Sequence, residues 1–160
     1  MELASWIYFY ARKYDDAVTL VNQALRSDSS DILLQRLTSL QRRVNLNEAM
    51  RTASRIRDSK MRSVELLWTD LRMGNKTAGL QLHHHFDTIP NSEVMRARLL
   101  VIEGKYDLAI DLLEVGFDQR RVRNGGDDLE SLSVHPAYDP LRDHPRFKKL
   151  MEKMNYPKLD

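Results

Sequence analysis

The chain contains no cysteine, little glycine and no long apolar run, and each of these absences narrows its chemistry. Without cysteine there can be no disulfide, no thiol nucleophile and no cysteine-ligated zinc. The apolar runs are far shorter than a membrane span. Only 6 of 160 residues are glycine, β-branched runs are short, and the helix formers Leu, Arg, Ala and Met dominate. This composition predicts an all-α fold.

A strong excess of charge of one sign is also missing. The formal net charge is +2, which argues against a dedicated nucleic-acid binder. With 42% hydrophobic and 30% charged residues, the composition is that of a globular chain, and its length suits one domain. No N-terminal stretch has the segments of a signal peptide. We expect a cytoplasmic location, with a periplasmic location as the alternative.

An internal repeat runs through the sequence. KYDDAVTLVNQAL (13–25) and KYDLAIDLLEVGF (105–117) align without a gap, and two weaker copies lie at 45–56 and 74–86. Anchoring the copies on Ala17, Ala49, Ala78 and Ala109 gives spacings of 32, 29 and 31 residues. Gly79 is an alternative anchor for the third copy. A repeat of this length is typical of helical arrays.

Each copy is predicted to be the second helix of a hairpin. Apolar residues recur four and eight positions after the anchor, which places them on one helical face; Arg57 is the exception. Another amphipathic segment precedes each copy, at 2–11, 31–43, 61–73 and 92–103. The links within each pair are short, so the two helices should be antiparallel. One hairpin cannot bury its apolar face alone, and stacked hairpins can.

These features predict a right-handed α-solenoid of four degenerate helix hairpins followed by a C-terminal cap. The hairpins span about 1–30, 31–59, 60–90 and 91–120. Residues 121–160 then form a proline-rich turn and a capping helix. Clusters of Ser, Asp, Asn and Pro between the hairpins are expected to end one helix and cap the next.

The stretch HPAYDPLRDHPRF (135–147) is interpreted as part of that cap. Prolines do not fit helix interiors, but Pro145 suits a first helical position, with Asp143 or His144 as the N-cap. An apolar stripe follows, made of Phe147, Leu150, Met151 and Met154. Both histidines lie beside prolines at turns, which favours a structural role over a ligand site. A plug of this kind would close the open apolar end of a solenoid.

The repeats resemble the tetratricopeptide-repeat (TPR) family, whose second-helix signature is similar to KYDDAVTLVNQALRSDSSD. The ending HPAYDPLRDHPRF and the opening WIYFYARKYDDAV resemble a bacterial group of these modules. In that group the modules are attached to winged-helix transcription regulators, nucleotide cyclases or protein kinases. His135 stands where the group usually has an acidic residue. The resemblance implies a C-terminal regulatory or sensory part of a larger bacterial signalling or transcription regulator.

The residues that could carry chemistry do not form a catalytic or metal-binding set. His83, His84 and His85 are consecutive in a predicted helix, so they point about 100° apart, whereas a chelating pair needs i, i+4 spacing. His83 with Asp87 has that spacing and is one ligand short. The serines lack a nucleophile-elbow context, and the Gly125–Gly126 turn lacks the lysine of a phosphate loop. We therefore expect no enzyme activity, no metal and no cofactor.

The expected function is protein or peptide binding on the wall formed by the first helix of each hairpin. The candidate residues are Trp6, Tyr10, Arg42, Trp68, Arg72 and Arg98. Aromatic residues would supply contact area, and arginines would pair with carboxylates or backbone oxygens. The alternative for Trp6 and Trp68 is a place in the core. Trp68 in particular shares its stripe with Val64, Leu67 and Leu71.

Three alternatives stay open from the residues. The first is self-association, with a homodimer formed through the aromatic N-terminal face around Trp6 to Tyr10. The second is a small-ligand sensor that uses the same groove. The third is nucleic-acid contact by the basic stretch 42–62, which holds Arg42, Arg43, Arg51, Arg55, Arg57, Lys60 and Arg62. Aromatic residues do not interleave with these cations, so base stacking lacks support.

Overall fold

The computed structural model describes residues 2–119 and 131–154, with side chains described from Ala4 onward. Over these residues the chain consists of helices and turns and contains no strand, so the predicted all-α class is confirmed. It divides into two compact units, with the boundary between Leu82 and His83. The Gly125–Gly126 turn and the neighbouring Asp127 and Asp128 lie outside the described residues.

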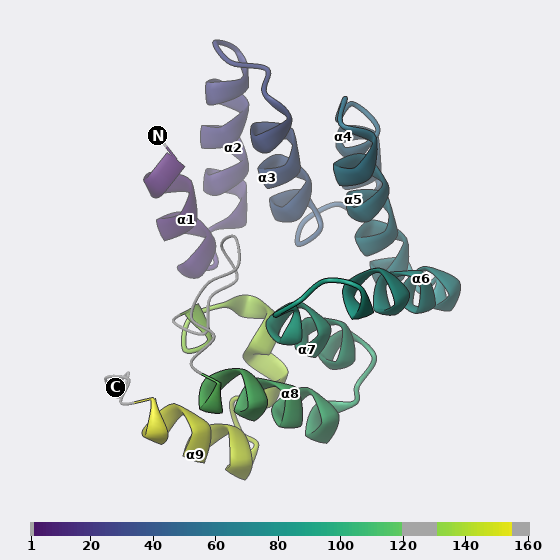
Figure 1. The fold of residues 1–160 in the computed structure, drawn as a ribbon. Helices are drawn as coiled ribbons and strands as arrows, with labels where there is room; N and C mark the ends of the chain where they lie inside the picture. Colours follow the sequence, from purple (N-terminus) through teal and green to yellow (C-terminus); the bar gives the residue numbers. More distant parts are fainter. Residues whose placement is uncertain (1, 120–130, 155–160) are drawn as a thin grey trace. The chain divides into compact units, whose positions relative to one another are not determined.

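The first unit is built from short consecutive helices (Figure 1). They are α1 (Glu2–Tyr10), α2 (Tyr14–Leu25), α3 (Asp31–Gln41), α4 (Leu46–Ala53), α5 (Ser59–Arg72) and α6 (Lys76–Asp87), which continues into the second unit. Each of α1 to α4 packs against the next helix in the chain, and α3 also packs against α5. These ranges coincide closely with the helical segments expected from the sequence.

The repeated alanines lie in the core of the helix pairs. Ala17, Ala49 and Ala109 are each 0% exposed, which is the close approach that a side chain of one methyl group permits. Around Ala17 in the first unit gather Phe9, Val21, Leu33, Leu37 and Leu40, with Trp6 and Tyr10 packed partly buried against them. The i, i+4 apolar spacing of the sequence therefore marks the buried face of α2.

Three of the tight turns within helix pairs share one backbone feature. Arg12, Gly74 and Gly104 have positive φ angles of 64°, 97° and 75°. Each stands two residues after the end of the first helix of its pair. Glycine adopts this left-handed conformation without strain, whereas Arg12 carries the strain of a Cβ atom. A buried small residue follows each of them after five positions. By this spacing Gly79, which is also buried, would be the anchor of the third copy, whereas the buried residues four and eight positions on, Leu82 and Phe86, follow Ala78.

Polar side chains cap the starts of several helices. Ser30 and Asp58 lie in the clusters between hairpins for which the sequence predicted caps, and Asn45 lies in a link within a hairpin. Ser30 Oγ accepts a hydrogen bond from Leu33 N (3.4 Å), Asn45 Oδ1 from Asn47 N (3.1 Å) and Asp58 Oδ1 from Met61 N (2.7 Å). Each bond satisfies an amide that the first turn of a helix leaves unpaired. Ser92 precedes α7 but acts differently, because its hydroxyl donates to Phe86 O at 2.7 Å.

The second unit contains the end of α6 and four further helices among the described residues. They are α7 (Glu93–Ile102), α8 (Tyr106–Asp118), the 3-10 helix η2 (Pro136–Leu141) and α9 (Pro145–Lys153). α7 packs against α8 and η2, and α8 packs against α9. Their shared core consists of Ala97, Val101, Ala109, Ile110, Leu113, Leu132, Tyr138, Leu141, Phe147 and Leu150. The proline-rich segment is thus part of this core.

The expectation that prolines stay outside helix interiors is wrong for Pro140, which lies within η2. Pro136 and Pro145 behave as expected, because each stands at the start of its helix. A short 3-10 helix needs few amide donors, and here Tyr138 N donates to His135 O (3.1 Å) while Arg142 N donates to Asp139 O (3.2 Å). Pro140, which has no N–H, falls between these two bonds.

None of the helices in residues 2–119 and 131–154 combines the length and the apolar character that a bilayer crossing requires.

Candidate binding surface

One side of the first unit gathers polar and aromatic side chains from α1, α3 and α5. These are the first helices of the three expected hairpins in this unit. α3 packs against α5, and a contact between Trp6 and Arg36 joins α1 to α3. We call this surface the first-helix face and define it by Trp6, Tyr10, Gln35, Arg36, Arg42 and Glu65.

The α1 part of the first-helix face is aromatic. Trp6 and Tyr10 are one helical turn apart and stack, with ring centroids 5.8 Å apart and an interplanar angle of 22°. Phe9 lies beneath them, 2% exposed and edge-on to Trp6 at 5.5 Å. Arg36 places its Cζ 5.2 Å from the centroid of the Trp6 ring, within the range of a cation–π interaction. Trp6 and Tyr10 are only partly buried, so ring surface remains available for contact.

A buried carboxylate links α3 to α5. Glu65 is 4% exposed, and both of its oxygens are engaged by α3. Gln35 Nε2 donates to Oε1 at 3.0 Å, and Arg42 Nη1 donates to Oε2 at 2.5 Å. The two donors are seven residues apart on α3, which puts them on the same helical face with Glu65 between them. Burying a carboxylate is costly unless it is paired and hydrogen-bonded in this way.

The other residues that the sequence singled out have different surroundings. Trp68 is 5% exposed and lies in the core with Leu71, which is the alternative that its stripe had left open. Arg72 is exposed at the end of α5 and makes no polar contact within the described residues. Arg98 lies on α7 in the second unit, partly buried, with Nη1 3.9 Å from Met95 Sδ. Of the candidates, Trp6 and Tyr10 lie together on α1 beside Arg36 of α3, and Arg42 links the end of α3 to Glu65 of α5.

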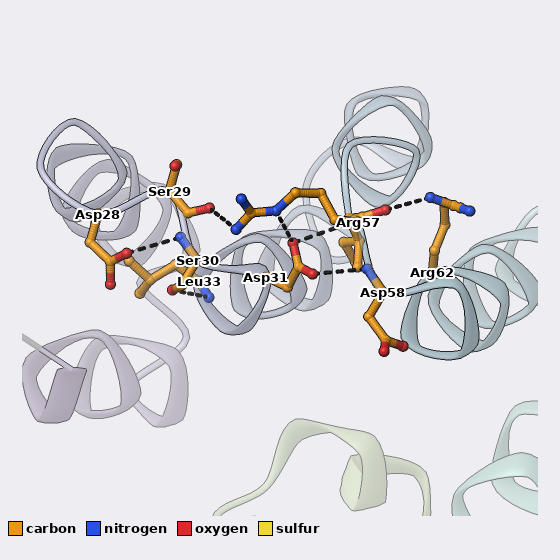
Figure 2. A network of polar contacts seen from close by, with 9 residues as sticks. Asp28, Ser29, Ser30, Asp31, Leu33, Arg57, Asp58 and Arg62 are labelled. Carbon is orange, nitrogen blue, oxygen red and sulfur yellow. Dashed lines mark hydrogen bonds and ion pairs between the residues drawn. The ribbon is translucent and has the colours of Figure 1, made fainter.

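A polar network fixes the starts of α3 and α5 (Figure 2). Asp31 accepts hydrogen bonds from the backbone amides of Arg57 (3.0 Å) and Asp58 (2.9 Å) and from Arg57 Nε (3.3 Å). Arg57 Nη2 also donates to Ser29 O at 3.2 Å. The backbone hydrogen bond from Arg57 is the main cause that lowers the pKa of Asp31, and the one from Asp58 adds to it. These hydrogen bonds join the loop before α3 to the loop before α5.

The basic stretch 42–62 is largely neutralised by such contacts. Arg42 binds Glu65, Arg57 binds Asp31, and Arg51 forms an ion pair with Glu48. Arg62 Nη1 donates to Ile56 O at 2.7 Å. Most guanidinium groups of this stretch therefore have partners within the protein. The stretch does not present a continuous array of free cations that could contact phosphate groups.

In the second unit, ion pairs hold the end of α6 to α7. His83 Nε2 lies 3.0 Å from Glu103 Oε1, and Lys105 Nζ lies 2.8 Å from Glu103 Oε2. Burial acts to raise the pKa of Glu103, but the hydrogen bonds from Lys105 and His83 outweigh it and lower the pKa. Asp87 pairs with Arg96 at 3.1 Å. His83 and Asp87 thus have separate partners, and no group of three or more potential metal ligands occurs in the described part of the chain.

The proline-rich segment is fixed by hydrogen bonds as well as by its core residues. His135 is 3% exposed, and its Nδ1 accepts from Ala137 N at 3.0 Å, as an N-cap of η2. Tyr138 Oη donates to Val94 O at 3.2 Å. At the start of α9, Arg146 Nη2 contacts Asp111 (2.6 Å) and Glu114 (2.8 Å) on α8. The hydrogen bonds from Arg146 to Asp111 and Glu114 raise the pKa of the guanidinium, which stays charged.

Comparisons with protein-family models, with curated proteins and with solved structures find no match for this chain. The function has to be inferred from the residues described above.

Proposed function

We propose that this chain is a non-catalytic TPR-like module that binds a protein or peptide segment on the first-helix face. The observation that carries the proposal is the half-buried Trp6–Tyr10 stack beside Arg36 of the neighbouring helix α3. Aromatic residues and arginine are the residue types that dominate the binding energy at protein interfaces. Neighbouring side chains hold the Trp6 ring in place, because Phe9 packs edge-on against it and Arg36 lies over the indole.

The repeat architecture that we propose is a right-handed solenoid of four hairpins closed by the η2–α9 segment. Support comes from the recurrence of one local geometry. A residue with positive φ precedes each of three second helices, and a buried small residue follows five positions later. In a solenoid the first helices of successive repeats lie side by side, so a ligand can run across several of them. The contacts of α3 with α5 agree with this arrangement in the first unit.

The resemblance of the ending HPAYDPLRDHPRF extends the proposal to the protein's wider role. We infer that the module is the C-terminal regulatory or sensory part of a larger bacterial signalling or transcription regulator that acts in the cytoplasm. Buried His135, Tyr138 and Phe147 give this ending a structural role within the second unit. The regulatory role rests on the resemblance alone, and the coding sequence upstream of Met1 tests it.

Peptide selection tests the binding function directly. A displayed library of random 12-residue peptides is selected on the full chain, and the affinity of synthetic selected peptides is measured by fluorescence anisotropy. Tyr10→Ala should weaken binding by about tenfold or more, as expected when an aromatic anchor is truncated. Tyr106→Ala is the matched control, because Tyr106 is a partly exposed tyrosine (39%) on α8 of the second unit. Circular dichroism confirms that both variants remain helical.

Two results would reject the proposal. Selection that yields no peptide with measurable affinity would rule out peptide binding by this module. Peptides that lose affinity with Tyr106→Ala and keep it with Tyr10→Ala would place the site elsewhere on the chain.

A further inference from the structure

Glu65 is a buried acid, and both of its carboxylate oxygens accept hydrogen bonds from side chains of the same unit. Gln35 occupies Oε1 and Arg42 occupies Oε2, and the side chain of Glu65 is 6% exposed. A ligand therefore cannot use this carboxylate as its acceptor. Its effect on the surface is indirect, because it determines where the guanidinium of Arg42 is held.

Arg42 is anchored at one nitrogen only. The polar contacts of its side chain within the described residues all run through Nη1, to Glu65 Oε2 at 2.5 Å and to Glu65 O at 3.4 Å. Nε and Nη2 have no hydrogen-bond partner there, and neither atom is sealed from solvent. These two nitrogens form the side edge of the planar guanidinium, which donates two parallel hydrogen bonds to the two oxygens of a carboxylate. The side chain is 11% exposed, so packing limits its freedom.

A second cation stands on the same side of α5. Arg72 follows Glu65 by seven residues, which is two helical turns, or about 10 Å along the helix axis. Arg72 is exposed and has no polar contact within the described residues. The charge of Glu65 is balanced by that of Arg42, so Arg72 adds positive charge on the same side of α5, two turns beyond Glu65.

We propose that the first-helix face recognises an acidic peptide segment, with one carboxylate bound side-on to Nε and Nη2 of Arg42. A second acidic residue of the ligand lies near Arg72, and an apolar or aromatic residue covers the Trp6–Tyr10 stack. Glu65 is a positioning residue in this arrangement, because it holds Arg42 without touching the ligand. This inference rests on the peptide-binding function proposed above and specifies the chemistry of the partner.

The composition of the selected peptides is the first test. Random 12-residue peptides selected on the full chain should be enriched in Asp and Glu over the unselected library. Arg42→Lys keeps the charge and removes the two-donor edge, so the affinity of the selected peptides should fall about tenfold or more. Arg72→Ala should also reduce the affinity, and this exposed substitution carries little risk for folding. Arg51→Ala is the control of equal charge, because Arg51 is exposed on α4.

Glu65→Gln separates positioning from simple charge. It adds one positive charge to the face, so bulk electrostatics alone predicts tighter binding of an acidic peptide. Loss of the anchor for Arg42 predicts weaker binding. The comparison is made on protein that retains wild-type circular dichroism; if the variant does not fold, Arg42→Lys and Arg72→Ala decide the question.

The possible failures are distinguishable. If selection yields no binders, the peptide-binding function itself is wrong. If the selected peptides are not acidic, or bind Arg42→Lys and Arg72→Ala like the wild type, the acidic-ligand inference is wrong and peptide binding stands. An equal loss with Arg51→Ala shows nonspecific charge attraction and also overturns the inference.

Discussion

Replacing Phe147 by alanine tests whether the proline-rich ending is part of the second unit's core. Phe147 is 1% exposed, and its ring stacks on that of Tyr138 with centroids 6.4 Å apart. Truncation of a fully buried phenylalanine costs about 3–5 kcal/mol, because transfer free energy is lost and a cavity remains. For a chain of this length that unfolds as one unit, each kcal/mol lowers Tm by about 2–4 °C, so a loss of about 6–20 °C is expected.

The measurement is urea unfolding followed by circular dichroism, with thermal unfolding as a second readout. Lys149→Ala is the matched control on the same helix, because Lys149 is exposed and makes no polar contact within the described residues. Its effect should stay within about 0.5 kcal/mol. A loss below about 1 kcal/mol for Phe147→Ala would refute the reasoning. It would mean that α9 only covers the surface of α8.

Three further predictions concern the first unit. Because the hydrogen bonds that Asp31 accepts lower its pKa below the ordinary 3.8, the stability it contributes is present above that pH and is lost as the pH falls through the folded-state pKa. The difference in urea midpoint between wild type and Asp31→Asn should therefore shrink from pH 6 to pH 3; a constant difference would contradict the assignment. Arg12→Gly should stabilise the chain by about 1 kcal/mol or less in urea unfolding. The substitution removes the strain of the Cβ atom at φ 64°, and the greater conformational entropy of glycine in the unfolded chain offsets part of this gain. A clear destabilisation would show that the strain is absent. No dimer should form through α1, because Ile7 (61%) is the only largely exposed hydrophobic among its described side chains, and one residue offers much less area than a stable dimer buries. Light scattering of wild type and Ile7→Lys tests this; a dimer that Ile7→Lys dissolves would instead support self-association through α1.

The helices could be predicted from the sequence because local spacing determines them. Ala17 and Ala109 with their i+4 partners mark buried faces, and polar clusters such as the one containing Ser30 mark the helix starts. The register of the third copy stays divided, because Ala78 and Gly79 are both buried: the turn at Gly74 favours Gly79, and the buried Leu82 and Phe86 favour Ala78. The helical turn around Pro140 was missed, since the sequence rule applies to α-helices and 3-10 turns tolerate the absent donor.

The candidate surface was predicted only in part. Trp6, Tyr10 and Arg42 were singled out as candidates because aromatic and basic residues recur at the repeat spacing. The partner of Arg42 was missed, because Glu65 lies 23 residues away and pairing across two helices leaves no local pattern. One clue was present: Glu65 interrupts a stripe shared with Met61 and Trp68, and a charge within a buried stripe is informative. The spacing of Trp68 alone could not decide between a place in the core and a place on the binding surface, since positions of both kinds occur within one turn of α5.

The boundary between the two compact units falls inside α6, between Leu82 and His83, and not in a loop. Leu82 is 0% exposed on one side of it, and Phe86 is 5% exposed on the other. A single cut in the polypeptide can therefore leave the whole of this helix with one unit only, and not with both. Any truncated version for crystallisation or gene fusion must carry all of Lys76–Asp87, so that two overlapping fragments would both contain this helix.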